Sequence, residues 1–249
     1  MFFLGQALAG DIVSIPAGSF TQGSAREPDA PVRNVHQSAY RIDRTEVTIA
    51  AFEAFASGAW GERRWWSDEG WLWAEAHPGG AGPALRRAGR ATDHPVVAVT
   101  WFEADAYCRA QGGALPTESQ WERAATGDGN RRFPWGDTER GGTWAGGEKY
   151  AVLQDMGTVS VTSQDRSLAS PFGLLHMAGN VWEWTRDRYD RDGARGDATD
   201  PTGPTGGPWR TLRGGSFANL PSSCTTTHRE PALPDRVALT TGFRCVYAP

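Results

Sequence analysis

Apolar and polar residues alternate near the start of the chain, from Asp11 to Phe20, until Pro16 and Gly18 interrupt the pattern. Alternation with a period of two predicts a half-buried strand, and the Pro and Gly predict a turn into a hairpin. The segment from His36 to Asp43 predicts another short strand. The apolar residues 1–10 are interpreted either as the remnant of an export signal or as a first strand.

Three segments have the pattern of amphipathic helices. From Thr48 to Ser57, apolar residues recur at 49, 52, 55 and 56, which predicts a helix capped by Thr48 and stopped by Gly58. Two further helices begin at capping boxes, in which a Thr hydroxyl and a Glu or Gln side chain each accept from the other residue's backbone N–H. The boxes are Thr100–Glu103 and Thr117–Gln120, and these helices end near Gly112 and Gly127.

A Trp-rich insert from Trp60 to Arg90 lies between the first two helices. Trp71 and Trp73 would share one face of a strand, whereas Trp66 and Trp73 would share one face of a helix. These Trp side chains could stack on a sugar or peptide ligand, but we favour the interpretation that they pack in the core. Residues 133–165 have little periodicity, and residues 190–208 predict a long surface loop.

Scattered short strands, capped helices and long loops predict an α+β fold. No polar linker divides the chain, so residues 11–249 are expected to form a single domain. The content of 31 Gly and 16 Pro agrees with a loop-rich architecture with little regular secondary structure. A net charge of −4 provides no attraction for nucleic acid, and no apolar run approaches the length of a membrane span.

The chain has 3 cysteines, which allow one pair and one leftover thiol. A stable disulfide needs an oxidising compartment, and Ala7-Leu8-Ala9 has the small residues of a signal-peptidase site. We therefore favour a periplasmic or secreted protein, with a cytoplasmic one as the alternative.

A series of short motifs resembles the formylglycine-generating enzyme, or sulfatase-modifying factor, family. The resemblance runs in family order over almost the whole chain and implies a C-type-lectin-like fold. The motifs are Ile15-Pro-Ala-Gly-Ser-Phe20, Arg44-Thr-Glu-Val-Thr48, His94-Pro-Val-Val-Ala-Val-Thr-Trp101, Leu115-Pro-Thr-Glu-Ser-Gln-Trp-Glu122, Phe133-Pro-Trp-Gly136, Gly179-Asn-Val-Trp-Glu-Trp184, Arg213-Gly-Gly-Ser216 and Gly242-Phe-Arg-Cys245.

The resemblance implies a disulfide between Cys108 and Cys245. Such a bridge would join the helix that begins at Thr100 to the final strand. Two buried free thiols in a cytosolic protein are the alternative interpretation.

The resemblance also places Cys224 at the second of two thiols that hold Cu(I) in similar enzymes, while Asn219 stands at the first. An amide cannot replace a thiolate as a ligand for this soft metal, so copper is not expected. Cys224 can alternatively pack as a small apolar side chain, or form a nucleophile or metal site with His228.

Calcium is a second cofactor that the resemblance implies, in a structural role. Its ligands would be the backbone carbonyls of Gly179 and Val181 and the carboxylate of Glu183, with His176 at the fourth position. Imidazole is a poor calcium ligand, so the alternative is that Glu183 is a buried carboxylate satisfied by backbone N–H groups.

Three arginines accompany these motifs. For Arg213 and Arg244 we favour a structural role, in which they bond backbone carbonyls and fix loops. Arg229, with His228 beside it, remains a candidate for binding a substrate carboxylate or phosphate.

Two functions from different classes follow. The first is an oxidoreductase acting on a peptide or peptide-like substrate, with Ser216, Asn219, Cys224 and Trp182 at its site. The family includes a siderophore-maturation protein thought to work without the thiol pair. The second is a non-catalytic binding module that displays its C-terminal loops, residues 216–227, to a ligand or protein partner, as retroelement-diversified proteins do on a similar scaffold.

Overall fold

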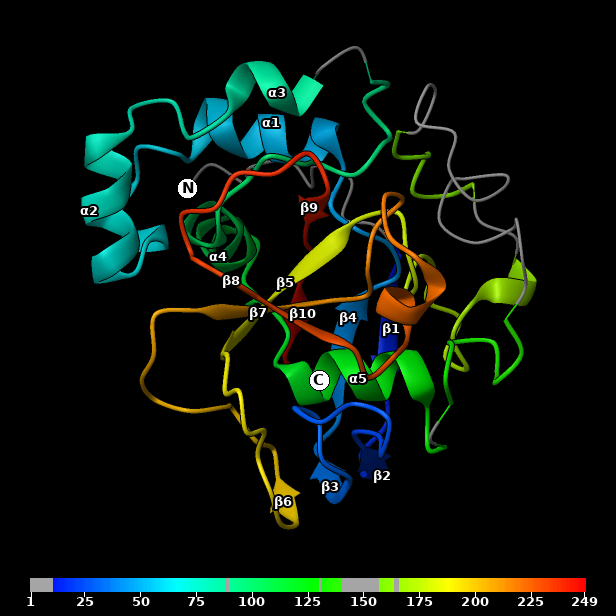
Figure 1. Ribbon diagram of the computed structural model, residues 1–249. Coiled ribbons are helices and arrows are strands. Elements are labelled where there is room, and N and C mark those ends of the chain that lie inside the picture. Colours follow the sequence, from blue (N-terminus) through cyan, green and yellow to red (C-terminus); the bar gives the residue numbers. More distant parts are fainter. Residues whose placement is uncertain (1–10, 88–89, 130, 140–156, 164–165) are drawn as a thin grey trace.

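The computed structural model describes residues 11–87, 90–129, 131–139, 157–163 and 166–249 (Figure 1). The interpretation of residues 1–10 lies outside this part of the chain. The elements are small and are joined by long loops. The strands are β1 (Ile12–Ile15), β2 (Gly18–Gln22), β3 (Arg33–Gln37), β4 (Tyr40–Asp43), β5 (Trp182–Arg188), β6 (Ala198–Thr199), β7 (Arg210–Arg213), β8 (Arg229–Ala232), β9 (Thr241–Gly242) and β10 (Val246–Tyr247).

Helices are concentrated in the first half of the chain. The α-helices are α1 (Ile49–Gly58), α2 (Asp68–Ala76), α3 (Pro83–Arg87), α4 (Trp101–Ala110) and α5 (Glu118–Thr126), and the 3-10 helices are η1 (Arg63–Trp65), η2 (Arg166–Leu168) and η3 (Pro221–Cys224). None of the described helices is long and apolar enough to cross a bilayer. The predicted loop-rich α+β architecture is confirmed.

The described strands form three small sheets. Their strand orders are β1-β4-β10, β2-β3-β6 and β8-β7-β5-β9. Strand β5 pairs antiparallel with β7 and parallel with β9, so the sheet brings residues near 182, 213 and 242 together. Helix α5 packs against β2 and β3 on one side and against β5 and β7 on the other, which places it between two sheets (Figure 1).

Local capping chemistry starts the predicted helices where expected. Thr48 caps α1 by accepting from the N–H of Ala51 at 3.2 Å. Both capping boxes are present, and in each the Thr hydroxyl oxygen and the N3 side chain accept from the reciprocal backbone N–H groups. The helices end close to Gly112 and Gly127, whose positive φ angles of 77° and 69° suit glycine.

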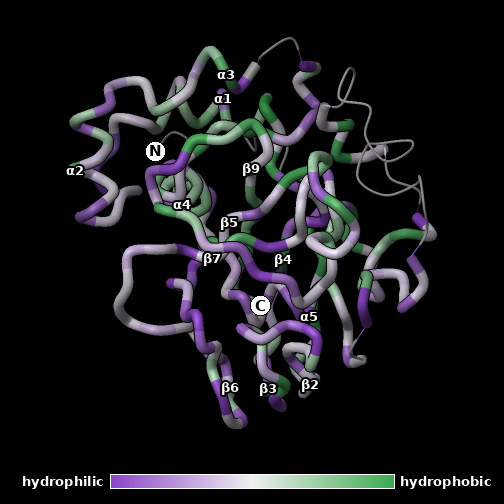
Figure 2. Tube along the Cα trace, in the orientation of Figure 1, coloured by the Kyte–Doolittle hydropathy of each residue, from purple (hydrophilic) through white to green (hydrophobic). Residues whose placement is uncertain are grey.

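The segment from 36 to 43 differs from its prediction, because it contains the end of β3 and the start of β4 rather than one strand. The backbone N–H of Ser38 donates to Asp200 at 2.7 Å instead of to a neighbouring strand, which interrupts the ladder. Asp200 lies in the predicted surface loop 190–208, which contributes only β6 to a sheet. In Figure 2 this loop and β6 lie at the lower left and are mostly white and purple.

The Trp-rich insert is largely helical, but Trp66 and Trp73 do not share one helix, because Trp66 lies between η1 and α2 and only Trp71 and Trp73 belong to α2. Trp66 is 3% exposed and its ring stacks 6.4 Å from that of Trp73, which in turn stacks on Phe102 of α4 at 5.8 Å. These two residues therefore pack into the core, and the favoured interpretation of core packing is confirmed for them.

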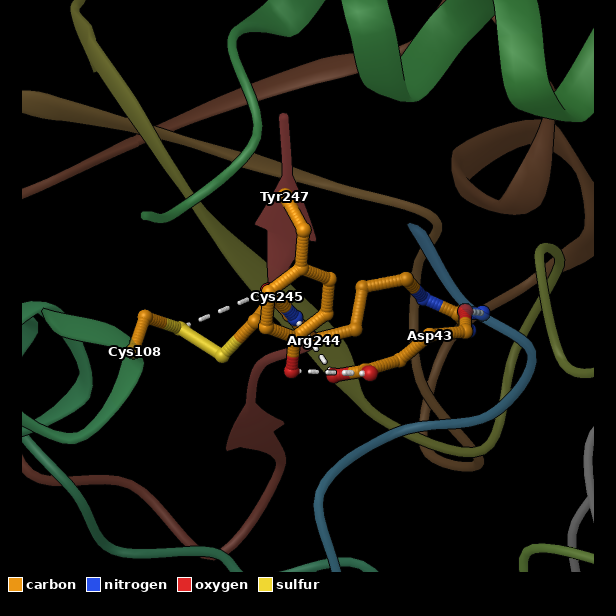
Figure 3. The surroundings of a disulfide bond; sticks show 5 residues. All are labelled: Asp43, Cys108, Arg244, Cys245 and Tyr247. Carbon is orange, nitrogen blue, oxygen red and sulfur yellow. Dashed lines mark hydrogen bonds between the residues drawn. A yellow bond between two sulfur atoms is a disulfide. The ribbon is translucent and has the colours of Figure 1, made fainter. Parts of the chain in front are cut away.

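Cys108 and Cys245 form the expected disulfide, with their Cα atoms 5.5 Å apart (Figure 3). The interpretation as two free thiols is wrong. The bridge fixes α4 to the chain that enters β10. Beside it, Asp43 accepts from the backbone N–H of Cys245 at 2.9 Å and from the hydroxyl of Tyr247 at 3.1 Å. Burial raises the pKa of Asp43 to about 6.

Candidate functional site

The loop that follows β7 brings three of the predicted site residues together. Ser216 donates to the side-chain oxygen of Asn219 twice, from its hydroxyl at 2.5 Å and from its backbone N–H at 3.1 Å. Cys224, at the end of η3, points its thiol toward the carbonyl oxygen of Ser216 at 3.9 Å. Ser216, Asn219 and Cys224 are therefore neighbours in space as well as in sequence.

The Cys224 thiol is sealed inside the protein. Its residue is 0% exposed, and it packs on Ala178 with Trp135 alongside. The backbone of Gly215 passes so close that a Cβ there would press on the sulfur, and its φ of 73° also requires glycine. Burial raises the pKa of Cys224 to about 12. The thiol is protonated at neutral pH, whereas the thiolate is the form that attacks and binds metals.

The fit of copper to these residues can be tested directly. Two of the 3 cysteines are bridged, so no second thiol is available to Cys224. The side-chain oxygen of Asn219 is engaged by Ser216. Among the described residues no group of three His, Cys, Asp or Glu side chains is arranged to hold a metal ion. The residues present do not fit a two-thiolate copper site.

Trp182 and His228 form a separate pair close to the same loop. Trp182 is 5% exposed, and its ring centroid lies 5.9 Å from that of His228. The Nδ1 atom of His228 lies 3.4 Å from both carboxylate oxygens of Glu27. His228 is thus directed toward Trp182 and Glu27, and we find no Cys–His hydrogen bond between the described Cys224 and His228 side chains.

A polar cleft of about 340 Å³ opens beside η3. Three distant segments line it: the loop after β2, the segment near 132–137, and the residues directly after Cys224. The lining residues are Ser24, Arg26, Glu27, Arg132, Asp137, Thr225 and Thr227. The backbone N–H of Thr226 donates to the carbonyl of Arg132 at 3.0 Å, which holds two of these segments together.

Sequence reasoning missed Arg26, Glu27, Arg132 and Asp137 as site residues. None carries a motif of its own, and the two segments that contain them reach the C-terminal loop only through tertiary contacts. The nearby motif Phe133-Pro-Trp-Gly136 was the one available signal that the second segment matters.

The guanidinium group of Arg229 is already engaged in hydrogen bonds within the protein, unlike that of an arginine held ready for a substrate. Its Nε and Nη2 atoms donate to the two carboxylate oxygens of Glu118 at 2.6 and 2.8 Å. Its Nη1 atom donates to the backbone carbonyls of Asp29 and Asp190. Although burial alone would raise the pKa of Glu118, the charges of Arg229 and Arg213 outweigh it and lower that pKa. These contacts favour a structural role for Arg229.

Arg213 and Arg244 fix loops from inside the protein, which confirms their structural interpretation. Arg213 donates to Glu122 and to the carbonyl of Thr226, each at 2.6 Å. Arg244 is 0% exposed and donates to the carbonyls of residues 43, 44 and 175 as well as to Glu183. Both residues join segments that are far apart in the sequence.

Glu183 of the predicted calcium site is also fully engaged. Its oxygens accept from Arg244 twice at 2.7 Å and from the ring N–H of Trp121 at 2.9 Å. Side-chain donors, rather than backbone N–H groups, satisfy this buried carboxylate. Burial lowers the pKa of His176 to about 3, and the charge of Arg244 adds to that effect. The described arrangement around Glu183, Gly179, Val181 and His176 does not fit calcium, because the carboxylate charge is already neutralised.

Comparison with known proteins supplies a second line of information. The model of the sulfatase-modifying factor enzyme 1-like domain matches residues 5–249. A formylglycine-generating enzyme of Thermomonospora curvata is 34% identical over 291 residues, which cover 98% of this chain and 95% of that protein.

Two solved structures have the same fold. Treponema denticola variable protein 1 superposes with a TM-score of 0.75 at 22% identity, over 96% of this chain and 95% of that chain. PvdO from Pseudomonas aeruginosa gives a TM-score of 0.66 at 22% identity, with the same coverage of 96% and 95%.

Proposed function

This chain belongs to the sulfatase-modifying factor enzyme 1-like family, and we propose that it is a binding member of that family, one that holds a peptide or protein segment without copper-dependent thiol oxidation. The observation that carries the proposal is the state of Cys224. It is the one unbridged thiol of the chain, it is buried, and its neighbour at the first thiol position is an amide bonded to Ser216.

The cleft beside η3 supports the choice of ligand. Its lining combines charges of both signs, Arg26 and Arg132 with Glu27 and Asp137, and the hydroxyl groups of Thr225 and Thr227. Such a lining can form hydrogen bonds and ion pairs with the amide groups and charged side chains of a peptide, whereas it offers little contact surface to an apolar ligand. The disulfide supports export to an oxidising compartment, which is periplasmic or extracellular.

A Cu(I) titration against a chromophoric chelator tests the absence of copper chemistry. We expect the wild-type protein to take up no stoichiometric, tightly bound Cu(I). Asn219→Cys is the matched gain-of-function variant, because it places a second thiol where similar enzymes have one. Tight one-to-one binding by the wild type that is lost in Cys224→Ser would refute the proposal.

Peptide binding is tested separately, with peptides selected from a random library displayed on phage and then measured by calorimetry. We expect Arg132→Gln to weaken a selected peptide roughly 10-fold or more, the effect of losing a charged hydrogen bond. Arg41→Gln is the control, because Arg41 is exposed and lies outside the cleft. Equal affinities for all three proteins would place the peptide elsewhere.

An oxidoreductase acting on a peptide-like substrate is the second candidate. The contact between Cys224 and Ser216, together with the formylglycine-generating relatives, favours it. If this candidate is right, Cys224→Ser abolishes turnover of a cysteine-containing peptide, followed by mass spectrometry, and leaves the thermal midpoint unchanged. Unchanged turnover in that variant would remove Cys224 from any mechanism.

A further inference from the structure

A second cavity, of about 330 Å³, lies at the start of α5, away from Cys224. Its wall contains residues from β3, α5, β5, β7 and β8 and from the loop 190–208. Gly203 of that loop covers Asp187 so closely that a Cβ on Gly203 would lie 2.8 Å from the carboxylate oxygen Oδ1. The cavity is therefore lined by charged side chains from the strands and α5, and the loop 190–208 forms another part of its wall.

Most charges in this cavity are already paired. Arg229 binds Glu118 through two hydrogen bonds, and Arg213 binds Glu122 at 2.6 Å. Arg229 also lies 3.6 Å from Asp29. These contacts hold the wall in shape, and they share two guanidinium groups among three carboxylates, so this part of the wall is slightly acidic.

Three charged side chains of the lining form no direct ion pair among the described residues: Asp187, Asp190 and Arg33. Asp187 and Arg33 carry opposite charges. Asp187 is 4% exposed, accepts one hydrogen bond, from the backbone N–H of Glu118 at 3.1 Å, and forms no ion pair with a described cation. Arg33 donates its Nε–H to Gln22 at 2.9 Å and forms no ion pair with a described carboxylate. Both line the cavity.

A buried carboxylate without a cation is costly unless something compensates it. Burial raises the pKa of Asp187 to about 7 and the negative charge of Glu118 contributes to the rise, although the more distant charges of Arg186 and Arg229 oppose it. A ligand ammonium placed beside Asp187 would supply the missing charge. A ligand carboxylate would do the same for the planar donor fork of Arg33.

We propose that this cavity binds a free α-amino acid, whose ammonium group faces Asp187 and whose carboxylate faces Arg33. The volume is at the small end of ligand pockets and suits a ligand of this size. A metal ion is a poorer fit, because no described group of three potential ligand side chains is arranged to hold one. The proposal does not depend on the function of Cys224.

Calorimetry with the wild-type protein tests the proposal without any substitution. The common L-amino acids are the probes, each compared with its N-acetyl and its C-terminal amide derivative. We expect at least one amino acid to bind with a dissociation constant in the millimolar range or below. Both derivatives should bind roughly 10- to 100-fold more weakly, because each loses one charged contact.

Two variants then assign the contacts. Asp187→Asn keeps the acceptor for Glu118 but removes the charge, and Arg33→Gln removes the fork; each should weaken the amino acid roughly 10- to 100-fold. Arg41→Gln should leave the affinity unchanged. The proposal is overturned if no amino acid binds in the millimolar range, if the derivatives bind as well as the parent, or if Arg41→Gln is as weak as Arg33→Gln. If a variant does not fold, the comparison of each amino acid with its N-acetyl and amide derivatives on the wild-type protein still tests the proposal.

Discussion

The buried carboxyl group of Glu46 allows a direct measurement of how charge burial affects this fold. Its residue is 2% exposed, and its Oε1 atom accepts from the side chain of Asn180 at 2.9 Å. Its Oε2 atom is buried and has no hydrogen-bond partner among the described residues. Burial raises the pKa of Glu46 to about 8, although the charge of Arg244 opposes the rise and that of Glu183 adds to it.

The sign of the pH dependence follows from that pKa. An unfolded glutamate titrates near 4.5, so between pH 4.5 and 8 the folded protein holds a proton that the unfolded chain has released. The contribution of the neutral acid to stability is complete below pH 4.5 and is lost as the pH rises toward 8. Because one pKa unit corresponds to about 1.4 kcal/mol, Glu46 lowers the free energy of unfolding by about 3 kcal/mol at pH 7.

Glu46→Gln keeps the shape of the side chain and removes its titration. Urea unfolding followed by Trp fluorescence gives the free energies of unfolding. We expect the difference, variant minus wild type, to increase by about 3 kcal/mol between pH 4.5 and pH 7. The extra amide N–H adds an offset that does not change with pH. Glu75→Gln, at an exposed position, is the control. A pH-independent difference for Glu46→Gln would refute the reasoning, because it would mean that the folded protein carries an ionised Glu46.

Further predictions concern the elements that hold the site. Replacing both Cys108 and Cys245 by Ala should lower the free energy of unfolding by about 5 kcal/mol on the chain-entropy model, measured by urea unfolding, because the bridge closes a separation of 137 residues. Gly215→Ala should lower it by roughly 1–3 kcal/mol, since the φ of 73° and the buried thiol both oppose a side chain. Arg213→Met should lower the free energy of unfolding by about 3–5 kcal/mol by leaving the buried carboxylate of Glu122 unpaired; an effect below 1 kcal/mol would contradict that pairing. Chelation with EGTA should leave the thermal midpoint unchanged, since Arg244 occupies the Glu183 carboxylate; a fall would restore the calcium prediction.

How far the sequence predicts the fold depends on the range of the interaction involved. The capping boxes at Thr100 and Thr117 join residues three apart, so their signal is fully local and the helices were predicted correctly. The break between β3 and β4 depends on Asp200, which is 162 residues from Ser38. No local pattern carries such a contact, and the sequence of residues 36–43 alone predicts one continuous strand.

The same distinction applies to the candidate site. Ser216, Asn219 and Cys224 are close in sequence, and their grouping could be inferred before the structure was known. The burial of the thiol could not, because it depends on Ala178 and Trp135 from other segments. The pairing of Arg229 with Glu118 could not be inferred either, because the two residues are 111 positions apart in the sequence.

The frame of the C-terminal loop does not depend on its two exposed side chains, Ala218 and Leu220. Backbone groups hold the frame: the N–H of Gly179 donates to the carbonyl of residue 214 at 2.8 Å, and the N–H of Phe217 donates to the carbonyl of Asn180 at 3.0 Å. The side chain of Leu220, in contrast, is 63% exposed and Ala218 is exposed as well. Substitutions at these two positions can change what the loop contacts without disturbing the backbone bonds. A loop built in this way can vary its exposed side chains and still keep its shape, which is the property that a binding surface on this scaffold would require.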